Sequence, residues 1–110
     1  MKPLSLDQPW GRGFRVTHAH AFANGAHLPA ANFLPRGLGR SYGDLCVNDG
    51  GTLLHAFRRD ALLSFDDCNG VLTCESGATL ADIAQVMLPR GWFLPVVPGT
   101  RYVTVGGAVA

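Results

Sequence analysis

Apolar residues recur at helical spacing directly after Thr79. The positions are Leu80, Ile83, Ala84, Met87 and Leu88. Thr79 is a favourable N-cap residue, and Asp82 lies in the first turn, where its negative charge suits the helix dipole. Pro89 and Gly91 interrupt the pattern. The spacing therefore predicts an amphipathic helix that begins after Thr79 and ends before Gly91.

Short apolar runs between turn-forming residues predict strands. These runs occupy residues 33–34, 52–57, 71–75 and the extended stretch 92–97. Clusters of Asn, Asp, Gly and Pro at 48–51, 66–70 and 98–100 separate them as turns. Trp92 and Phe93 have apolar neighbours, so we expect them to fill the core and not to contact a ligand. Short strands beside one helix predict an α+β fold.

The two ends of the chain differ in pattern. Residues 1–31 show no clean period and contain Pro29, which predicts an N-terminal arm with at most a short strand. Residues 32–110 then form the domain proper. The last eight residues are small, apolar and uncharged, and they predict the opening of a buried helix. Our expectation is that the chain is the N-terminal part of a longer protein.

Composition and charge exclude several classes of protein. The 110 residues are 47% hydrophobic and carry a net charge of +1, which suits one domain without a basic stripe for nucleic acid. No apolar run approaches the roughly 20 residues of a membrane-spanning helix, and no signal peptide is recognisable, so a cytoplasmic location is expected. The cysteines Cys46, Cys68 and Cys74 form no C-x-x-C pair. Reduced thiols and no metal site are expected.

A glycine-rich loop follows the first predicted strand of the domain. It reads Arg36, Gly37, Leu38, Gly39, Arg40, Ser41, Tyr42, Gly43 and Asp44. Glycines let the backbone turn sharply and turn successive N–H groups toward one concave face, which suits an anion such as a pyrophosphate. A Rossmann fingerprint would need a glycine where Tyr42 stands, and a Walker loop would need a lysine. A turn that binds nothing remains open as an alternative.

A second candidate motif lies near the end of the chain. It consists of Gly99, Thr100, Thr104, Val105, Gly106 and Gly107. The threonine hydroxyls could hydrogen-bond a flat polar ligand, and a helix starting beyond Gly107 could face a phosphate. Ordinary turn formation and close packing would also explain these residues. The two motifs together suggest a ligand lying between them.

The two motifs in this order resemble the PCMH-type FAD-binding domain of the vanillyl-alcohol oxidase and p-cresol methylhydroxylase superfamily. The resemblance covers residues 10–110 and is greatest to the decaprenylphosphoryl-ribose oxidase-like group. It implies the first part of an FAD-binding domain in an FAD-dependent oxidoreductase, which oxidises a carbinol of a sugar or lipid-linked sugar by hydride transfer to flavin N5. It also implies that residues 36–44 wrap the FAD pyrophosphate, with Gly99, Thr100 and residues 104–107 as a second wall.

Two departures from the family refine this expectation. Covalent members often carry histidine at the position of Arg40, and arginine cannot form that bond, so dissociable FAD is expected. The His-Gly-Lys-Asn-His stretch that normally follows the glycine pair is not in this sequence. We therefore expect no catalytic residue in the chain and no turnover by it alone. An aldonolactone- or alditol-oxidase type of enzyme and a non-catalytic, degenerate binding module remain alternatives, and the oligomeric state stays open.

Overall fold

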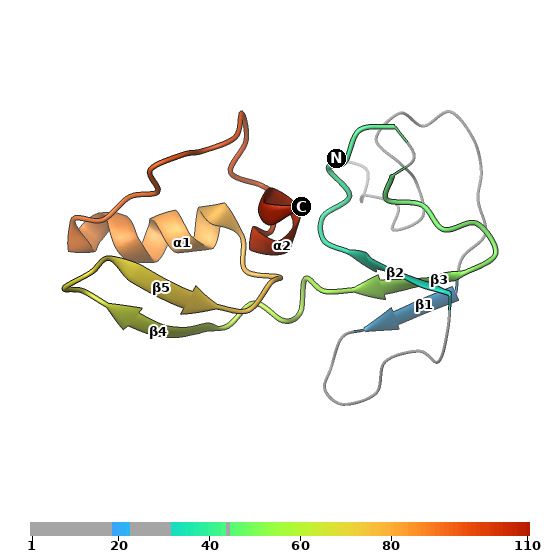
Figure 1. Ribbon diagram of the computed structural model, residues 1–110, viewed down its shortest axis with the longest axis horizontal. Helices are drawn as coiled ribbons and strands as arrows, with labels where there is room; N and C mark the ends of the chain where they lie inside the picture. The colour runs from blue at the N-terminus through green and yellow to red at the C-terminus, as the bar shows by residue number, and fades with distance from the viewer. Residues whose placement is uncertain (1–18, 23–31, 44) are drawn as a thin grey trace.

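Two groups of elements make up the described part of the protein. The computed structural model describes residues 19–22, 32–43 and 45–110. A small parallel sheet forms one group, and a β-hairpin with two helices forms the other (Figure 1). Residues 56–61 connect them. The expected mixture of short strands with a flanking helix is confirmed.

The parallel sheet has its last strand in the middle. It contains β1 (Ala19–Phe22), β2 (Phe33–Arg36) and β3 (Thr52–His55) in the order β1-β3-β2. Leu53, Leu54 and His55 are all buried, as is typical of an inner parallel strand. β2 is an edge strand, where the missing N–H of exposed Pro35 is tolerated.

The second group packs a helix against a hairpin. Strands β4 (Leu62–Asp66) and β5 (Val71–Cys74) pair antiparallel, and α1 (Leu80–Met87) lies along them (Figure 1). The buried α1 residues Leu80, Ile83 and Met87 form a core with half-buried residues of the hairpin and the C-terminal segment. A 3₁₀ turn, η1 (Leu88–Arg90), and α2 (Val105–Val109) complete the group.

The start of α1 follows the sequence prediction. Thr79 Oγ1 accepts a hydrogen bond from Asp82 N at 3.0 Å, and the Asp82 carboxylate accepts one from Thr79 N at 3.2 Å. This reciprocal pair is a capping box. The helix ends at Met87, and Gly91 stops η1 with a left-handed φ of 81°.

Three strand predictions need correction. β4 was not predicted, because its Leu-Leu-Ser-Phe-Asp sequence alternates poorly between apolar and polar residues. The strand predicted at 52–57 ends at His55, since the hydrogen bond from Arg59 N to Ala56 O closes a turn directly after it. Residues 92–97 form no strand in the described chain. They contain Pro95 and run in the connection between η1 and α2.

The core assignments near the C-terminus also need correction. Trp92 is 37% exposed and Phe93 is 59% exposed, so they do not fill the core. Trp92 instead covers the hairpin from outside, with its ring edge-to-face on Phe65 at 5.7 Å between centroids. The helix predicted after residue 103 is confirmed as α2, but it contains no buried residue. It also begins at the Thr104 N-cap and not beyond Gly107.

Candidate functional site

The glycine-rich loop leaves β2 with its main-chain donors available. Gly39 and Gly43 have φ values of 65° and 58°, in the left-handed region that glycine adopts most readily. Among the residues that the structure describes, no hydrogen bond uses the amides of residues 37–39 or 41–43 as donors. Left-handed glycines between other conformations build concave anion-binding nests. The loop thus has the backbone that such a nest requires.

A second wall faces this loop and is held by the start of α1. The amides of Leu80 and Ala81 donate to the carbonyls of Val103 and Arg101 at 3.1 and 3.0 Å. These bonds use two N–H groups that a helix start otherwise leaves unpaired. In return, Gly106 N donates to Ser76 O at 2.9 Å. Residues 101–106 are therefore fixed by backbone bonds to the start of α1 and to the segment before it, which no side-chain pattern in the sequence indicates.

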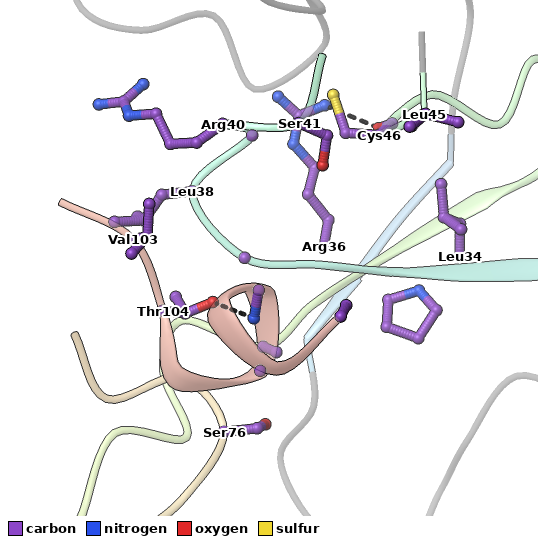
Figure 2. A pocket seen from close by; sticks show the side chains of 17 residues that line it. Leu34, Arg36, Leu38, Arg40, Ser41, Leu45, Cys46, Ser76, Val103 and Thr104 are labelled. Carbon is purple, nitrogen blue, oxygen red and sulfur yellow. Dashed lines mark hydrogen bonds between the residues drawn. The ribbon is translucent and has the colours of Figure 1, made fainter. Parts of the chain in front are cut away.

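The loop and the wall enclose one pocket (Figure 2). Its volume is about 480 Å³. The two sides meet where Gly37 approaches Thr104. The approach is so close that a Cβ atom on Gly37 would overlap Thr104 Oγ1. Thr104 is 3% exposed, and its hydroxyl accepts a hydrogen bond from Gly107 N at 3.1 Å. Thr104 thus both caps α2 and forms the floor where the two groups of elements touch.

Most of the predicted site residues line this pocket. Those that do are Arg36, Gly37, Leu38, Gly39, Arg40, Ser41, Thr104, Gly106 and Gly107. They come from segments more than sixty residues apart in the chain. The structure therefore brings the two motifs to one place, as the interpretation of a shared ligand requires.

Five of the predicted site residues that the structure describes do not line the pocket. Tyr42 is 87% exposed, and Gly43 follows it outside the lining. Gly99 and Thr100 lie in an exposed turn, where Thr100 Oγ1 accepts a hydrogen bond from Tyr102 N at 3.1 Å. Val105 packs against the α1 core. Asp44 lies outside the described residues.

The sequence prediction missed the remaining, mostly apolar residues of the lining. These residues are Leu34, Pro35, Leu45, Cys46, Ala56, Ser76, Val103 and Ala110. Widening each motif by two residues would have found Leu34, Pro35, Leu45, Cys46 and Val103, and a third residue would have added Ala110. Ala56 and Ser76 carry no such signal, because Ala56 lies in the connection between the two groups of elements and Ser76 lies between β5 and α1, both far from the motifs in sequence.

The charged groups of the described lining are of one sign. Arg36 and Arg40 are present, and no acidic residue is among them. Arg36 is 4% exposed and donates from Nη1 to the carbonyl of Cys46 at 3.2 Å, whereas Arg40 is half-buried. Ser41 adds an exposed hydroxyl. The positive lining, a hydroxyl and available amides fit the doubly charged pyrophosphate of a dinucleotide.

Comparison with known proteins agrees with this chemistry. Residues 16–110 match the FAD binding domain family. Decaprenylphosphoryl-beta-D-ribose oxidase of Mycolicibacterium smegmatis is 41% identical over 76 residues, which is 69% of this chain and 16% of that protein. D-lactate dehydrogenase of Anaerostipes hadrus is 36% identical over 61 residues, 56% of this chain and 13% of that protein.

The chain spans at most about a sixth of the length of these two relatives. No helix in the described residues is long and apolar enough to cross a membrane. The matched region includes both the glycine loop and the wall opposite it. Because the match covers far more than half of the sequence, the resemblance is confirmed, and the chain belongs to the PCMH-type FAD-binding domain family.

Proposed function

We propose that this chain is the FAD-binding portion of an oxidoreductase that oxidises a carbinol of a sugar or lipid-linked sugar. The observation that carries the proposal is the shared pocket, in which a loop with available amides faces the wall at residues 103–107. The sugar substrate is supported by the 41% identity to a decaprenylphosphoryl-ribose oxidase. A cytoplasmic location is part of the same proposal.

In this proposal the loop binds the pyrophosphate of FAD. The amides of residues 37–39 and 41, which line the pocket, donate to phosphate oxygens, and the half-buried Arg40 supplies positive charge beside them. Thr104 and Gly106 form the opposite wall. FAD, when bound, supplies the acceptor for a hydride from the carbinol carbon. The chain's own residues hold and orient the cofactor, and none of them is proposed as catalytic.

The bound FAD is proposed to be dissociable. Arg40 stands where covalently flavinylated relatives often carry histidine, and a guanidinium does not form that bond. Acid precipitation of the yellow protein should therefore leave the flavin in the supernatant. Yellow colour that stays in the washed pellet would show a covalent link and overturn this part of the proposal.

A 2-hydroxy acid is the second candidate substrate. It is supported by the match to D-lactate dehydrogenase and by 33% identity over 42 residues to a probable D-2-hydroxyglutarate dehydrogenase of Oryza sativa. Both substrate classes present a carbinol next to oxygen-bearing carbons. The pocket described here is lined by the cofactor loop, and its residues do not distinguish the two substrate classes.

Flavin bleaching separates the candidates. The purified yellow full-length oxidoreductase is mixed anaerobically with a phosphoryl-linked pentose, an aldonolactone, an alditol or a D-2-hydroxy acid, and its visible absorbance is followed. Bleaching by the pentose alone supports the main proposal, and bleaching by the hydroxy acid alone supports the second candidate. A colourless protein that does not take up FAD would contradict both and favour a non-catalytic module.

A further inference from the structure

We propose that Arg36 is a positioning residue that fixes the shape of the cofactor loop and does not itself contact the FAD phosphates. This inference rests on the proposed function, and it replaces the direct contact that the family resemblance implies for Arg36. It assigns different roles to the two arginines of one pocket. Arg36 shapes the loop, and Arg40 provides its charge to the anion.

The side chain of Arg36 joins three points of the loop. Arg36 is the last residue of β2, and its Nη1 donates to the carbonyl of Cys46, ten residues later, at 3.2 Å. Between these ends, a Cβ atom on Gly39 would lie 2.5 Å from Arg36 Nη2 and 3.1 Å from Cζ. The guanidinium therefore packs directly against the left-handed turn at Gly39. Figure 2 shows the guanidinium beside Cys46, with the bond between them dashed.

Burial and anchoring make this arrangement rigid. Arg36 is 4% exposed, and Cys46 is 5% exposed. A buried guanidinium is costly to move once its donors are satisfied, because moving it leaves polar groups unpaired. The backbone beneath it is part of the sheet, since Ala56 N donates to Arg36 O at 2.9 Å. The loop thus packs on the side chain of Arg36, and the backbone of Arg36 is hydrogen-bonded at the end of β3.

Arg40 differs from Arg36 in its burial and in the direction of its side chain. It is half-buried and lines the same pocket. In Figure 2 its side chain extends away from the guanidinium of Arg36. An arginine that contacts the anion directly contributes an electrostatic attraction to the binding free energy, and added salt screens that attraction. A buried arginine that only stabilises the loop contributes no such attraction. Salt dependence of FAD affinity therefore distinguishes the two roles.

The first experiment measures the Kd of FAD from 20 to 500 mM NaCl by quenching of flavin fluorescence. Arg36→Met should weaken FAD binding about tenfold to a hundredfold, as expected for loss of a charge-assisted buried hydrogen bond. The Kd of this variant should depend on salt concentration as the wild-type Kd does. Arg40→Met should weaken binding and also flatten that dependence. A flattened salt dependence in Arg36→Met would show direct phosphate contact and overturn the proposal.

The second experiment tests the apoprotein, without flavin. Trypsin cleavage after Arg40 reports on the loop, and cleavage after the exposed Arg101 is the internal control. Arg36→Met should accelerate cleavage after Arg40 about tenfold or more, in line with loss of the buried bond, while cleavage after Arg101 stays unchanged. Equal cleavage after Arg40 in both proteins would overturn the loop-shaping role. If the wild type fails to bind FAD, the proposed function fails, but this arm still decides the role of Arg36.

A second pair of variants covers the case in which Arg36→Met does not fold. Gly39→Ala should displace the guanidinium and reproduce faster cleavage after Arg40 with an unchanged salt dependence. Gly43→Ala is the matched control, since Gly43 shares the left-handed φ but a Cβ there meets nothing within 4 Å. If both variants behave alike, backbone strain alone explains the effect, and the proposal is overturned.

Discussion

Gly37 marks the closest approach of the two sides of the pocket. Its φ lies outside the left-handed region, so the requirement for glycine comes from the overlap that a Cβ atom would make with Thr104 Oγ1. Thr104 cannot simply withdraw, because it is buried and its hydroxyl caps α2. The glycine pattern was visible in the sequence, but its partner was not, since the contact joins segments 67 positions apart.

Gly37→Ala should lower the free energy of unfolding by about 1–3 kcal/mol, the range for overpacking a well-packed site. Thr104→Ala should cost about 1 kcal/mol through loss of the N-cap. The double variant should be less unstable than the sum of the two, because the smaller residue 104 removes the overlap. Urea denaturation of the four proteins measures this coupling, and strict additivity would contradict the contact.

α1 was predictable because the information that specifies it is local. The cap, the first-turn acid and the apolar spacing all lie within ten residues of Thr79. The hairpin was only half predicted: the turn at 66–70 and β5 were recognised, whereas β4 depends on pairing with β5 more than on its own pattern. Gly99 and Thr100 show the same dependence on distant contacts. Turn residues have the same sequence pattern whether or not they line a pocket.

The hairpin turn is stabilised by an ionised side chain. The Asp66 carboxylate accepts from the side-chain amide of Asn69 at 2.7 Å and from the main-chain amides of Asn69 and Cys68 at 3.1 and 3.0 Å. The side-chain bond of Asn69 is the main reason that the pKa of Asp66 is lower than usual, followed by the two main-chain bonds. The folded state therefore favours the charged carboxylate.

This shift gives the hairpin an acid-sensitive contribution. Because the folded pKa is lower than the roughly 3.9 of an unstructured aspartate, the stabilisation is complete above that value and disappears as the pH falls through the folded pKa. Asp66→Asn keeps a turn acceptor but cannot titrate. Urea midpoints measured between pH 7 and pH 2.5 should fall less in Asp66→Asn than in the wild type, and parallel curves would contradict the assignment.

The pocket lies where the parallel sheet meets the helical group, so a ligand there contacts both. Arg36 to Ser41 belong to the sheet side, whereas Thr104, Gly106 and Gly107 belong to the helical side. The connection between them packs against the helical side: Gly77 N donates to Arg59 O at 2.7 Å, and a Cβ atom on Gly77 would overlap the carbonyl of Ala56. The parallel pairing and this meeting of two groups were not predictable, because both arise from contacts distant in sequence.

FAD should therefore stabilise the molecule as a whole. At a free concentration one hundred times its Kd, a ligand that binds only the folded state adds about 2.7 kcal/mol. For a domain of this size that corresponds to a rise in Tm of roughly 10–20 °C. Differential scanning calorimetry with FAD should show the shift, and FMN, which lacks the pyrophosphate bridge, should shift the Tm much less. Equal shifts would indicate that the loop does not bind that bridge.

The order β1-β3-β2 has a consequence for synthesis on the ribosome. Among the strands that the structure describes, β1 and β2 each pair with β3 and not with each other, and β3 is translated last of the three. Neither outer strand can find its partner until Thr52–His55 has left the exit tunnel. Residues 37–43 would thus emerge before their support exists, and the nascent chain can acquire a cofactor-competent loop only after the central strand has been released.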